Sequence, residues 1–375
     1  MVSGPAVDAD SFRQELRSWL EDHPSPSITV ATIDDEAETL RGWQRALFAG
    51  GWVGIHWPVE YGGRGASVLE VAIFNEEMAR AGAADIPGKV GLSLVGPALM
   101  AYGSERQKSQ WMPRILNGDD VWCQLFSEPG AGSDLTSLST RAERHDDVYV
   151  VTGQKVWTTY AQFSDTGIAL VRTDPEAPKS KGISMLAVPM KAKGVEVRPL
   201  RQMTGDCEFN EVFLDEVEVP VENLIGPEHG GWRVASTVLA NERGGGFIWK
   251  QQVRQEDAVD RLWKTCAGAG LFDDPLVRQR LAQAWIEAEL FRLHNARTLA
   301  RLAQGEELGA ESSLVKLFWS ETSKRFYETA YDLVGASAAD EWTNDFLYSR
   351  ANTIMGGSSE IQRNIIGERL LGLPR

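Results

Sequence analysis

The stretch from Leu125 to Asp134 contains the residue types best suited to hold a polar ligand. It combines two glycines, one proline, two serines and two acidic residues, a composition that excludes a strand in a hydrophobic core. A glycine-containing loop can bring backbone N–H groups close to a ligand that carries oxygen acceptors. An ordinary surface turn is the alternative, but the position directly after an apolar run favours a ligand-binding loop.

A second candidate feature is the segment Lys155–Thr159, in which a tryptophan stands beside two threonines. A flat indole next to hydroxyl groups suits a planar heteroaromatic ring that needs one face covered and its ring nitrogens hydrogen-bonded. Trp157, Thr158 and Thr159 are therefore candidate ligand contacts. Without the preceding loop, the same pattern would indicate only a half-buried strand.

Glu242 is the candidate acid–base residue. Val234, Ala235, Val238 and Leu239 precede it at helical spacing, and all four share one face of the predicted helix with it. A carboxylate on an apolar helix face is desolvated, which raises its pKa and makes it a stronger base. The alternative is that Glu242 forms an ion pair with a basic residue elsewhere in the chain.

Three consecutive glycines, Gly244, Gly245 and Gly246, follow shortly after Glu242. Glycine disfavours the interior of a helix, so their presence needs a physical reason. One reason is space for a bulky ligand beside a wall without side chains. The other is a simple end to the helix.

The apolar periodicity divides the chain into three domains. It predicts an N-terminal helical domain at 1–120, a middle β domain at 121–225 and a C-terminal helical domain at 226–375. The protein is therefore expected to be mostly α with a central β domain. That domain should form a small barrel or a two-sheet structure, and the C-terminal helices a four-helix bundle.

Local signals predict where individual elements begin and end. Ser104 and Gln107 form a capping-box pattern for a helix that ends at Gly118, and Asp274–Pro275 is typical of a helix start. A turn at Gly153 is predicted to separate two paired strands. The other predictions are helices at 34–48, 68–81, 275–303, 312–334 and 358–371, and strands at 148–151, 156–159, 167–171, 184–188, 195–197 and 212–219.

Composition and charge exclude several classes of partner. The formal net charge of −15 disfavours nucleic acids and anionic membrane surfaces, which require a basic surface. The five histidines and three cysteines show no metal-ligand spacing, so no metal is expected. The cysteines are interpreted as buried thiols in a reducing compartment. The first ten residues lack a signal-peptide pattern, and a cytoplasmic location is predicted.

Together, these motifs resemble those of the acyl-CoA dehydrogenase family, and the resemblance covers almost the whole chain. The loop from Ser127 to Asp134 matches the first signature of the family closely, and Gly357–Arg363 resembles the second. Further similarity runs from Trp57–Pro58 and Tyr61–Gly63 to the terminal segment Leu371–Pro374. The family fold has the same order of helical, β and helical domains.

The resemblance implies a bound FAD and an acyl-CoA substrate, and it assigns their contacts by position. Arg243 corresponds to a family arginine near the coenzyme A moiety. The implied flavin contacts are Leu125, Phe126, Ser127, Trp157, Thr158, Thr159, Ser358 and Glu360, and the implied substrate contacts are Ser133, Arg243 and Gly356.

The resemblance also implies the reaction. Many members carry a catalytic glutamate immediately before the glycine of the second signature, where this chain has Gly356. A minority place the base on the helix that here contains Glu242. Glu242 is therefore predicted to remove the α-proton while a hydride passes from the β-carbon to the flavin. The N–H of Gly356 and a flavin ribityl hydroxyl would hydrogen-bond the thioester oxygen.

Two motifs that reach a neighbouring subunit's FAD in homotetrameric members are altered here. An Arg-x-x-Phe-Gly motif corresponds to Trp263–Gly270, and a Gln-x-x-Gly-Gly motif corresponds to Asp332–Ala336. This pattern resembles actinobacterial dehydrogenases that work as α2β2 heterotetramers on steroid or other bulky acyl-CoA thioesters. It implies a homologous second subunit, with this chain carrying the base. Electron-transferring flavoprotein is the acceptor that the family implies.

Two other functions are compatible with the same resemblance. The chain could be a non-catalytic partner subunit that stabilises a homologous enzyme, in which case Glu242 is not a base. It could instead be a flavin-dependent oxygenase or oxidase on the same fold, in which case the reduced flavin reacts rapidly with oxygen.

Overall fold

The computed structural model of the 375-residue chain describes residues 8–28, 33–242, 247–306, 308–335 and 339–374. Two compact units are formed. Residues 25–65 and 84–242 make up the first, here called the sheet unit, and residues 1–24, 66–83 and 243–375 make up the second, called the bundle unit. The division into domains at 1–120, 121–225 and 226–375 stays a prediction.

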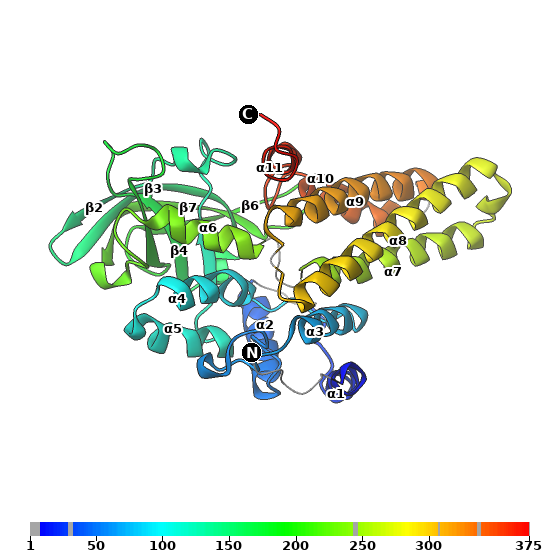
Figure 1. Ribbon diagram of the computed structural model, residues 1–375, viewed down its shortest axis with the longest axis horizontal. Helices are drawn as coiled ribbons and strands as arrows, with labels where there is room; N and C mark the ends of the chain where they lie inside the picture. The colour runs from blue at the N-terminus through cyan, green and yellow to red at the C-terminus, as the bar shows by residue number, and fades with distance from the viewer. Residues whose placement is uncertain (1–7, 29–32, 243–246, 307, 336–338, 375) are drawn as a thin grey trace. The chain divides into compact units, whose positions relative to one another are not determined.

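The sheet unit is built on one seven-stranded sheet, and no separate second sheet is present among its described residues (Figure 1). The strand order is β1-β4-β2-β3-β7-β6, and β5 pairs with the other side of β4. Branched and aromatic side chains at alternate positions of the long strands fill the core, as Tyr149, Val151, Val217 and Val219 do. The strands are β1 (Trp122–Leu125), β2 (Arg141–His145), β3 (Val148–Thr159), β4 (Thr166–Arg172), β5 (Ile183–Pro189), β6 (Val195–Leu200) and β7 (Phe209–Pro220).

The predicted turn at Gly153 was wrong, because β3 continues through it as a single strand. Gly153 lies where the pairing register between β3 and β7 shifts. A Cβ atom at this position would overlap Thr140. The glycine therefore permits close packing and a bulge within a strand, and its presence in the sequence does not mark a chain reversal.

Helices cover the sheet unit and form where the capping signals predict. The capping box is confirmed: Ser104 Oγ accepts from the N–H of Gln107 at 3.2 Å, and Gln107 Oε1 accepts from the N–H of Ser104 at 3.0 Å. The helices are α2 (Ile33–Ala49), α4 (Gly96–Tyr102), α5 (Glu105–Asn117) and α6 (Gly231–Glu242), with a π turn at Gly91–Val95 and 3₁₀ turns at Val59–Tyr61, Leu135–Ser137, Ala161–Phe163 and Val221–Asn223.

The bundle unit is helical, and Figure 1 shows its long helices lying side by side. Leu262, Cys266, Leu281, Phe326 and Trp342 form the centre of one apolar core between them. The helices are α1 (Ala9–Asp22), α3 (Val68–Arg80), α7 (Phe247–Gly268), α8 (Pro275–Ala303), α9 (Ser312–Val334), α10 (Ala339–Asn352) and α11 (Ser359–Ile365), with a π turn at Ile366–Leu370 and 3₁₀ turns at Leu271–Asp273 and Gly309–Glu311. A mostly α chain with a central β domain is thus confirmed.

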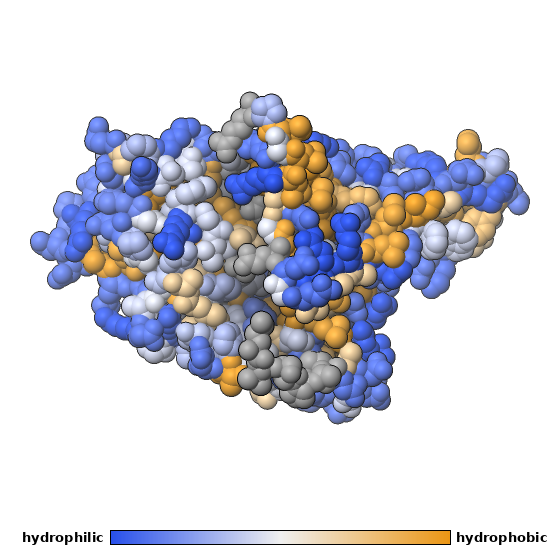
Figure 2. Space-filling view, in the orientation of Figure 1, coloured by the Kyte–Doolittle hydropathy of each residue, from blue (hydrophilic) through white to orange (hydrophobic). Residues whose placement is uncertain are grey.

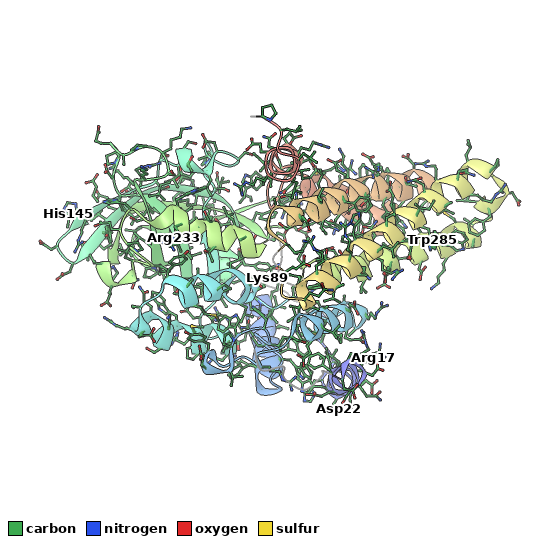
Figure 3. The ribbon with its side chains drawn as sticks, viewed as in Figure 1. Arg17, Asp22, Lys89, His145, Arg233 and Trp285 are labelled. Carbon is green, nitrogen blue, oxygen red and sulfur yellow. The ribbon has the colours of Figure 1, made fainter. Side chains whose placement is uncertain are left out.

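Ion pairs join helices α1 and α3 of the bundle unit. Arg17 of α1, labelled in Figure 3, donates from Nε to Glu77 Oε2 of α3 at 2.6 Å, and Arg13 pairs with the same buried carboxylate.

Apolar side chains remain on the surface of α8, among them Trp285, Ile286, Leu290 and Leu293. None of the described helices combines the length and the apolar character that crossing a membrane requires.

Candidate functional site

The predicted ligand-binding loop follows β1 directly and is organised around Glu128. The main chains of Glu128 and Ala131 bond each other reciprocally at 2.9 and 3.0 Å, which closes a tight turn. Glu128 Oε2 accepts from the N–H and hydroxyl of Ser139 at 2.7 and 2.8 Å, and Oε1 accepts from the N–H of Thr140 at 2.9 Å. This buried glutamate therefore fixes the loop and does not face a ligand.

A buried ion pair connects the loop to the strand that carries the second candidate motif. Lys155 of β3 is fully buried and donates from Nζ to Glu128 Oε1 at 2.9 Å. The same ammonium donates to the carbonyls of Phe126 at 3.1 Å and Leu170 at 2.7 Å. The N–H of Val156 also donates to the carbonyl of Ser127 at 2.9 Å. The two motifs thus form one rigid support.

Sequence reasoning gave Lys155 and Glu128 no role, although a usable signal existed. Lys155 is a charged residue in a segment whose alternative interpretation is a half-buried strand, and a buried charge requires a partner. Burial alone would raise the pKa of Glu128, but the Lys155 ammonium and the hydrogen bonds from Thr140 and Ser139 lower it to about 2. Burial lowers the pKa of Lys155 to about 8, against the attraction of Glu128. Both groups are predominantly charged at neutral pH.

Trp157 is the most unusual residue of the sheet unit. Its backbone has φ = 61°, in the left-handed region that a bulky side chain rarely adopts. The pairing register of β3 with β7 shifts between Lys155 and Thr158, so the strand bulges at the tryptophan. The indole is 61% exposed and touches Phe209 edge-on, with ring centroids 6.0 Å apart. The bulge therefore holds a large apolar ring on the surface.

The predicted contacts around Trp157 differ in accessibility. Ser127 and Thr159 are half-buried and Ser133 is exposed, so their hydroxyls can meet a ligand. Leu125 and Phe126 are buried, and any contact from them is confined to little side-chain surface. Thr158 is another predicted contact, but it is only 1% exposed. Its Oγ1 has no hydrogen-bond partner among the described residues.

Glu242 is the last residue of α6, and the structure describes its backbone but not its side chain. The preceding Val234, Ala235 and Val238 are fully buried where α6 packs on β4, β5 and α4. The predicted apolar face of this helix is therefore confirmed. Arg243 and the three glycines at 244–246 lie outside the described residues.

The second signature begins with a glycine turn in the bundle unit. Gly356 and Gly357 have φ values of 64° and 93°, which favour glycine. Ser358 caps α11, its Oγ accepting from the N–H of Ile361 at 3.4 Å. Glu360 is exposed, and hydrogen bonds from its own N–H and from Ser358 lower its pKa. Sequence reasoning missed Lys316 and Gln362, whose side chains bond the carbonyls of this turn.

The two altered motifs also lie in the bundle unit. Cys266 of the first is buried in the helical core, and Trp263 meets Phe272 edge-on, with centroids 5.1 Å apart. In the second, Asp332 forms an ion pair with Arg280 at 2.9 Å, and residue 336 lies outside the described residues. The side chains described for these segments belong to the bundle unit's own packing and surface.

Sequence models of the three acyl-CoA dehydrogenase domains match the chain. The N-terminal domain matches residues 7–119, the middle domain 123–217 and the C-terminal domain 229–371. Acyl-CoA dehydrogenase IpdE1 of Mycobacterium tuberculosis is 39% identical over 382 residues, which cover 98% of each chain.

Two solved structures share the fold along the whole chain. The Tcur3481-Tcur3483 steroid ACAD has a TM-score of 0.87 at 32% identity and covers 100% of both chains. The ChsE4-ChsE5 complex of Mycobacterium tuberculosis has a TM-score of 0.83 at 31% identity, again covering 100% of both chains.

Proposed function

The chain belongs to the acyl-CoA dehydrogenase family, a family of flavoproteins, and from this premise we propose that it binds FAD and oxidises the α,β carbon–carbon bond of an acyl-CoA thioester. The observation that carries the proposal is the rigid support formed by the loop from Ser127 to Asp134 and the strand of Trp157, joined by the buried Lys155–Glu128 pair. Such a support holds contact groups in place before a ligand arrives.

The residues of this support fit a flavin ring. An indole that is 61% exposed in a left-handed backbone conformation is unfavourable for the isolated chain, and backbone strain of this kind concentrates at ligand sites. Trp157 would cover the ring, the hydroxyls of Ser127 and Thr159 would bond its polar edge, and Ser358 and Glu360 would contact it from the C-terminal signature. Bound there, FAD supplies the acceptor for the hydride that leaves the β-carbon.

Glu242 is proposed as the base that removes the α-proton. It continues the helical register of the buried residues Val234, Ala235 and Val238, so its position belongs to the apolar side of α6. A carboxylate kept from water on that side is a stronger base than one in solution. Its proton transfer should be concerted with loss of the hydride, because the α-proton of a thioester is only weakly acidic.

The main chain of the glycine turn is proposed to stabilise the negative charge that develops on the thioester oxygen. The N–H of Gly356 would donate to that oxygen, and a fixed donor of this kind is most effective where water is excluded. Ser133 and Arg243 are the other proposed substrate contacts. Arg243 would offer a positive charge to the anionic coenzyme A in a chain of net charge −15.

The proposed acyl group is bulky, such as a steroid side chain or a branched or cyclic acid. The three glycines after Arg243 would leave the wall of the pocket free of side chains. A relative of the same fold is a steroid ACAD, which supports this choice. A faster turnover of octanoyl-CoA than of any ring-bearing thioester would contradict the proposal.

We further propose a homologous second subunit as partner. Ile286, Leu290 and Leu293 are exposed at the spacing of one helix face on α8. Trp285, labelled in Figure 3, is 56% exposed on the same helix, and Figure 2 shows apolar surface over the bundle unit. Exposed apolar surface of this kind is typical of a binding interface. A related structure is a complex of two different chains, ChsE4 and ChsE5.

The electron acceptor proposed for the reduced enzyme is electron-transferring flavoprotein, as the family implies. If purified electron-transferring flavoprotein is reduced no faster in the presence of the enzyme and substrate than with the enzyme alone, this acceptor is excluded. Rapid consumption of dissolved oxygen during turnover would instead indicate an oxidase or oxygenase.

The central test is the variant Glu242→Gln in the complex purified with its natural partner. Loss of a general base typically lowers the rate roughly 10²- to 10⁴-fold, and we expect kcat to fall by that range while KM changes little. The matched control is Glu218→Gln, which removes an exposed carboxylate from β7. Unchanged turnover in the Glu242 variant would show that this residue is not the base and would favour a non-catalytic role for the chain.

A further inference from the structure

Lys316 is a buried charged residue that the proposed chemistry does not use. It lies on α9, and its ammonium donates to the carbonyl of Asn352 at 3.1 Å and to that of Gly357 at 2.7 Å. Asn352 is the last residue of α10, so a cation there also meets the negative end of that helix. One side chain thus ties α9 to the end of α10 and to the glycine turn.

Gln362 also holds this turn. It follows the turn in the sequence, whereas Lys316 precedes it. Its Nε2 donates to the carbonyls of Gly356 at 3.0 Å and Gly357 at 3.1 Å, and the side chain is completely buried. A Cβ atom at Gly357 would stand 2.6 Å from this nitrogen, closer than such atoms approach. The glycine is therefore required for the contact as well as for its backbone angle.

These bonds fix how the peptide groups of the turn are oriented. In a trans peptide, the C=O of one residue and the N–H of the next point in opposite directions. Gln362 bonds the carbonyl of Gly356, and Lys316 and Gln362 both bond that of Gly357, so the peptides that follow these two glycines are fixed. The bond to its own carbonyl also holds Gly356, whose N–H is the proposed donor, in place. Charge-assisted hydrogen bonds such as those of Lys316 are stronger than neutral ones and hold this orientation firmly.

We propose that Lys316 and Gln362 are positioning residues, which hold the Gly356–Gly357 turn and thereby fix the position of the Gly356 N–H that donates to the thioester oxygen. This inference rests on the proposed function. The two side chains do not touch the substrate. They set the position of a donor, and a displacement of about 1 Å in such a group can cost about 100-fold in rate.

The test compares Lys316→Met, Lys316→Arg and Gln362→Leu in the purified complex. We expect Lys316→Met to lower kcat roughly 10- to 100-fold while KM changes less than about threefold, because the donor is misaligned mainly for the transition state. Lys316→Arg retains a cationic donor and should recover part of the loss. The control is Lys324→Met, a half-buried lysine two turns further along α9.

A second readout does not depend on turnover. Hydrogen–deuterium exchange of the peptide covering 353–362 should become faster in Lys316→Met and in Gln362→Leu, while the rest of the bundle unit stays protected. In the double variant the losses of kcat should be less than multiplicative, since both side chains hold one turn. A variant that loses only thermal stability, with kcat per folded enzyme retained, would overturn the proposal.

The outcomes separate this inference from the function on which it rests. Loss of activity in Glu242→Gln with full kcat in Lys316→Met would overturn the positioning role alone. Full activity in Glu242→Gln would contradict the proposed base, whatever the lysine variants do.

Discussion

Two buried lysines hold the two signature regions, and they do so by different means. Lys155 in the sheet unit donates to the Glu128 carboxylate and to two carbonyls, and thereby fastens a loop to a strand. Lys316 in the bundle unit donates to two carbonyls and fastens a glycine turn to a helix. The first residue supports a surface that carries side-chain contacts, whereas the second supports a main-chain donor.

The difference predicts different consequences when each lysine is lost. Without Lys155, a buried carboxylate remains without its cation, which is costly to the fold. Without Lys316, two neutral carbonyls lose a donor, and the turn can relax at a smaller cost in stability. Loss of Lys155 should therefore mainly lower the free energy of unfolding, whereas loss of Lys316 should mainly lower kcat.

The largest stability effect is expected for Lys155→Met. Leaving Glu128 buried and unpaired should lower the free energy of unfolding by ~3–5 kcal/mol. Denaturant titration of the purified complex gives this quantity. If Lys155→Met lowers the free energy of unfolding no more than Lys316→Met does, the proposed difference between the two lysines is wrong.

A smaller loss is expected when acid protonates Glu128 in the unchanged protein. The folded-state pKa of about 2 lies below the ordinary value of 4.5, so the stabilisation is complete above pH ~4.5 and declines as the pH falls towards 2. The difference in unfolding free energy between the wild type and Glu128→Gln should therefore narrow over that range. If this difference in unfolding free energy stayed constant over that pH range, the ion pair between Glu128 and Lys155 would not be the source of the stabilisation.

Substitution of the turn glycine should have a moderate effect. Gly357→Ala places a side chain at φ = 93° and against Gln362, and a left-handed backbone costs an ordinary residue ~1–2 kcal/mol. We expect a loss of this size by thermal unfolding, together with a lower kcat. The reference is Gly268→Ala, where a Cβ atom would meet nothing within 4 Å.

The smallest effect is expected for Lys179→Met. Lys179 pairs with Asp134 at 2.6 Å, but both side chains are exposed, so solvent screens the interaction. The loss of unfolding free energy should be far smaller than that of Lys155→Met, measured in the same denaturant titration. An equal cost for the two lysines would show that burial is not what makes the Glu128 pair strong.

The sequence predicted several helices because their signals are local, but α4 and α10 were not predicted. The capping box at Ser104 and the start of α8 at Asp274–Pro275 depend on residues a few positions apart. Strands β1 and β2 were not predicted as separate elements, and Gly153 was misinterpreted, because strand pairing depends on partners distant in the chain.

The candidate site was predictable as motifs but not as a set of contacts. Ser127 and Trp157 were recognisable by type, whereas burial of Thr158 depends on a bulge that no local pattern announces. Lys155 and Lys316 gain their roles only when distant segments meet. The roles of these two lysines therefore could not be predicted from the local sequence.

The order of the two units along the chain has a consequence for biosynthesis. The chain passes between them at 24/25, 65/66, 83/84 and 242/243, so the bundle unit is assembled from three separate segments. Ala72 of α3 packs in one core with Trp249, Phe291 and Trp319 of later helices. Until those helices have been synthesised, α1 is the only described helix of the bundle unit that can cover the apolar side of α3. Nascent chains should thus expose this early helix to chaperones until translation is nearly complete.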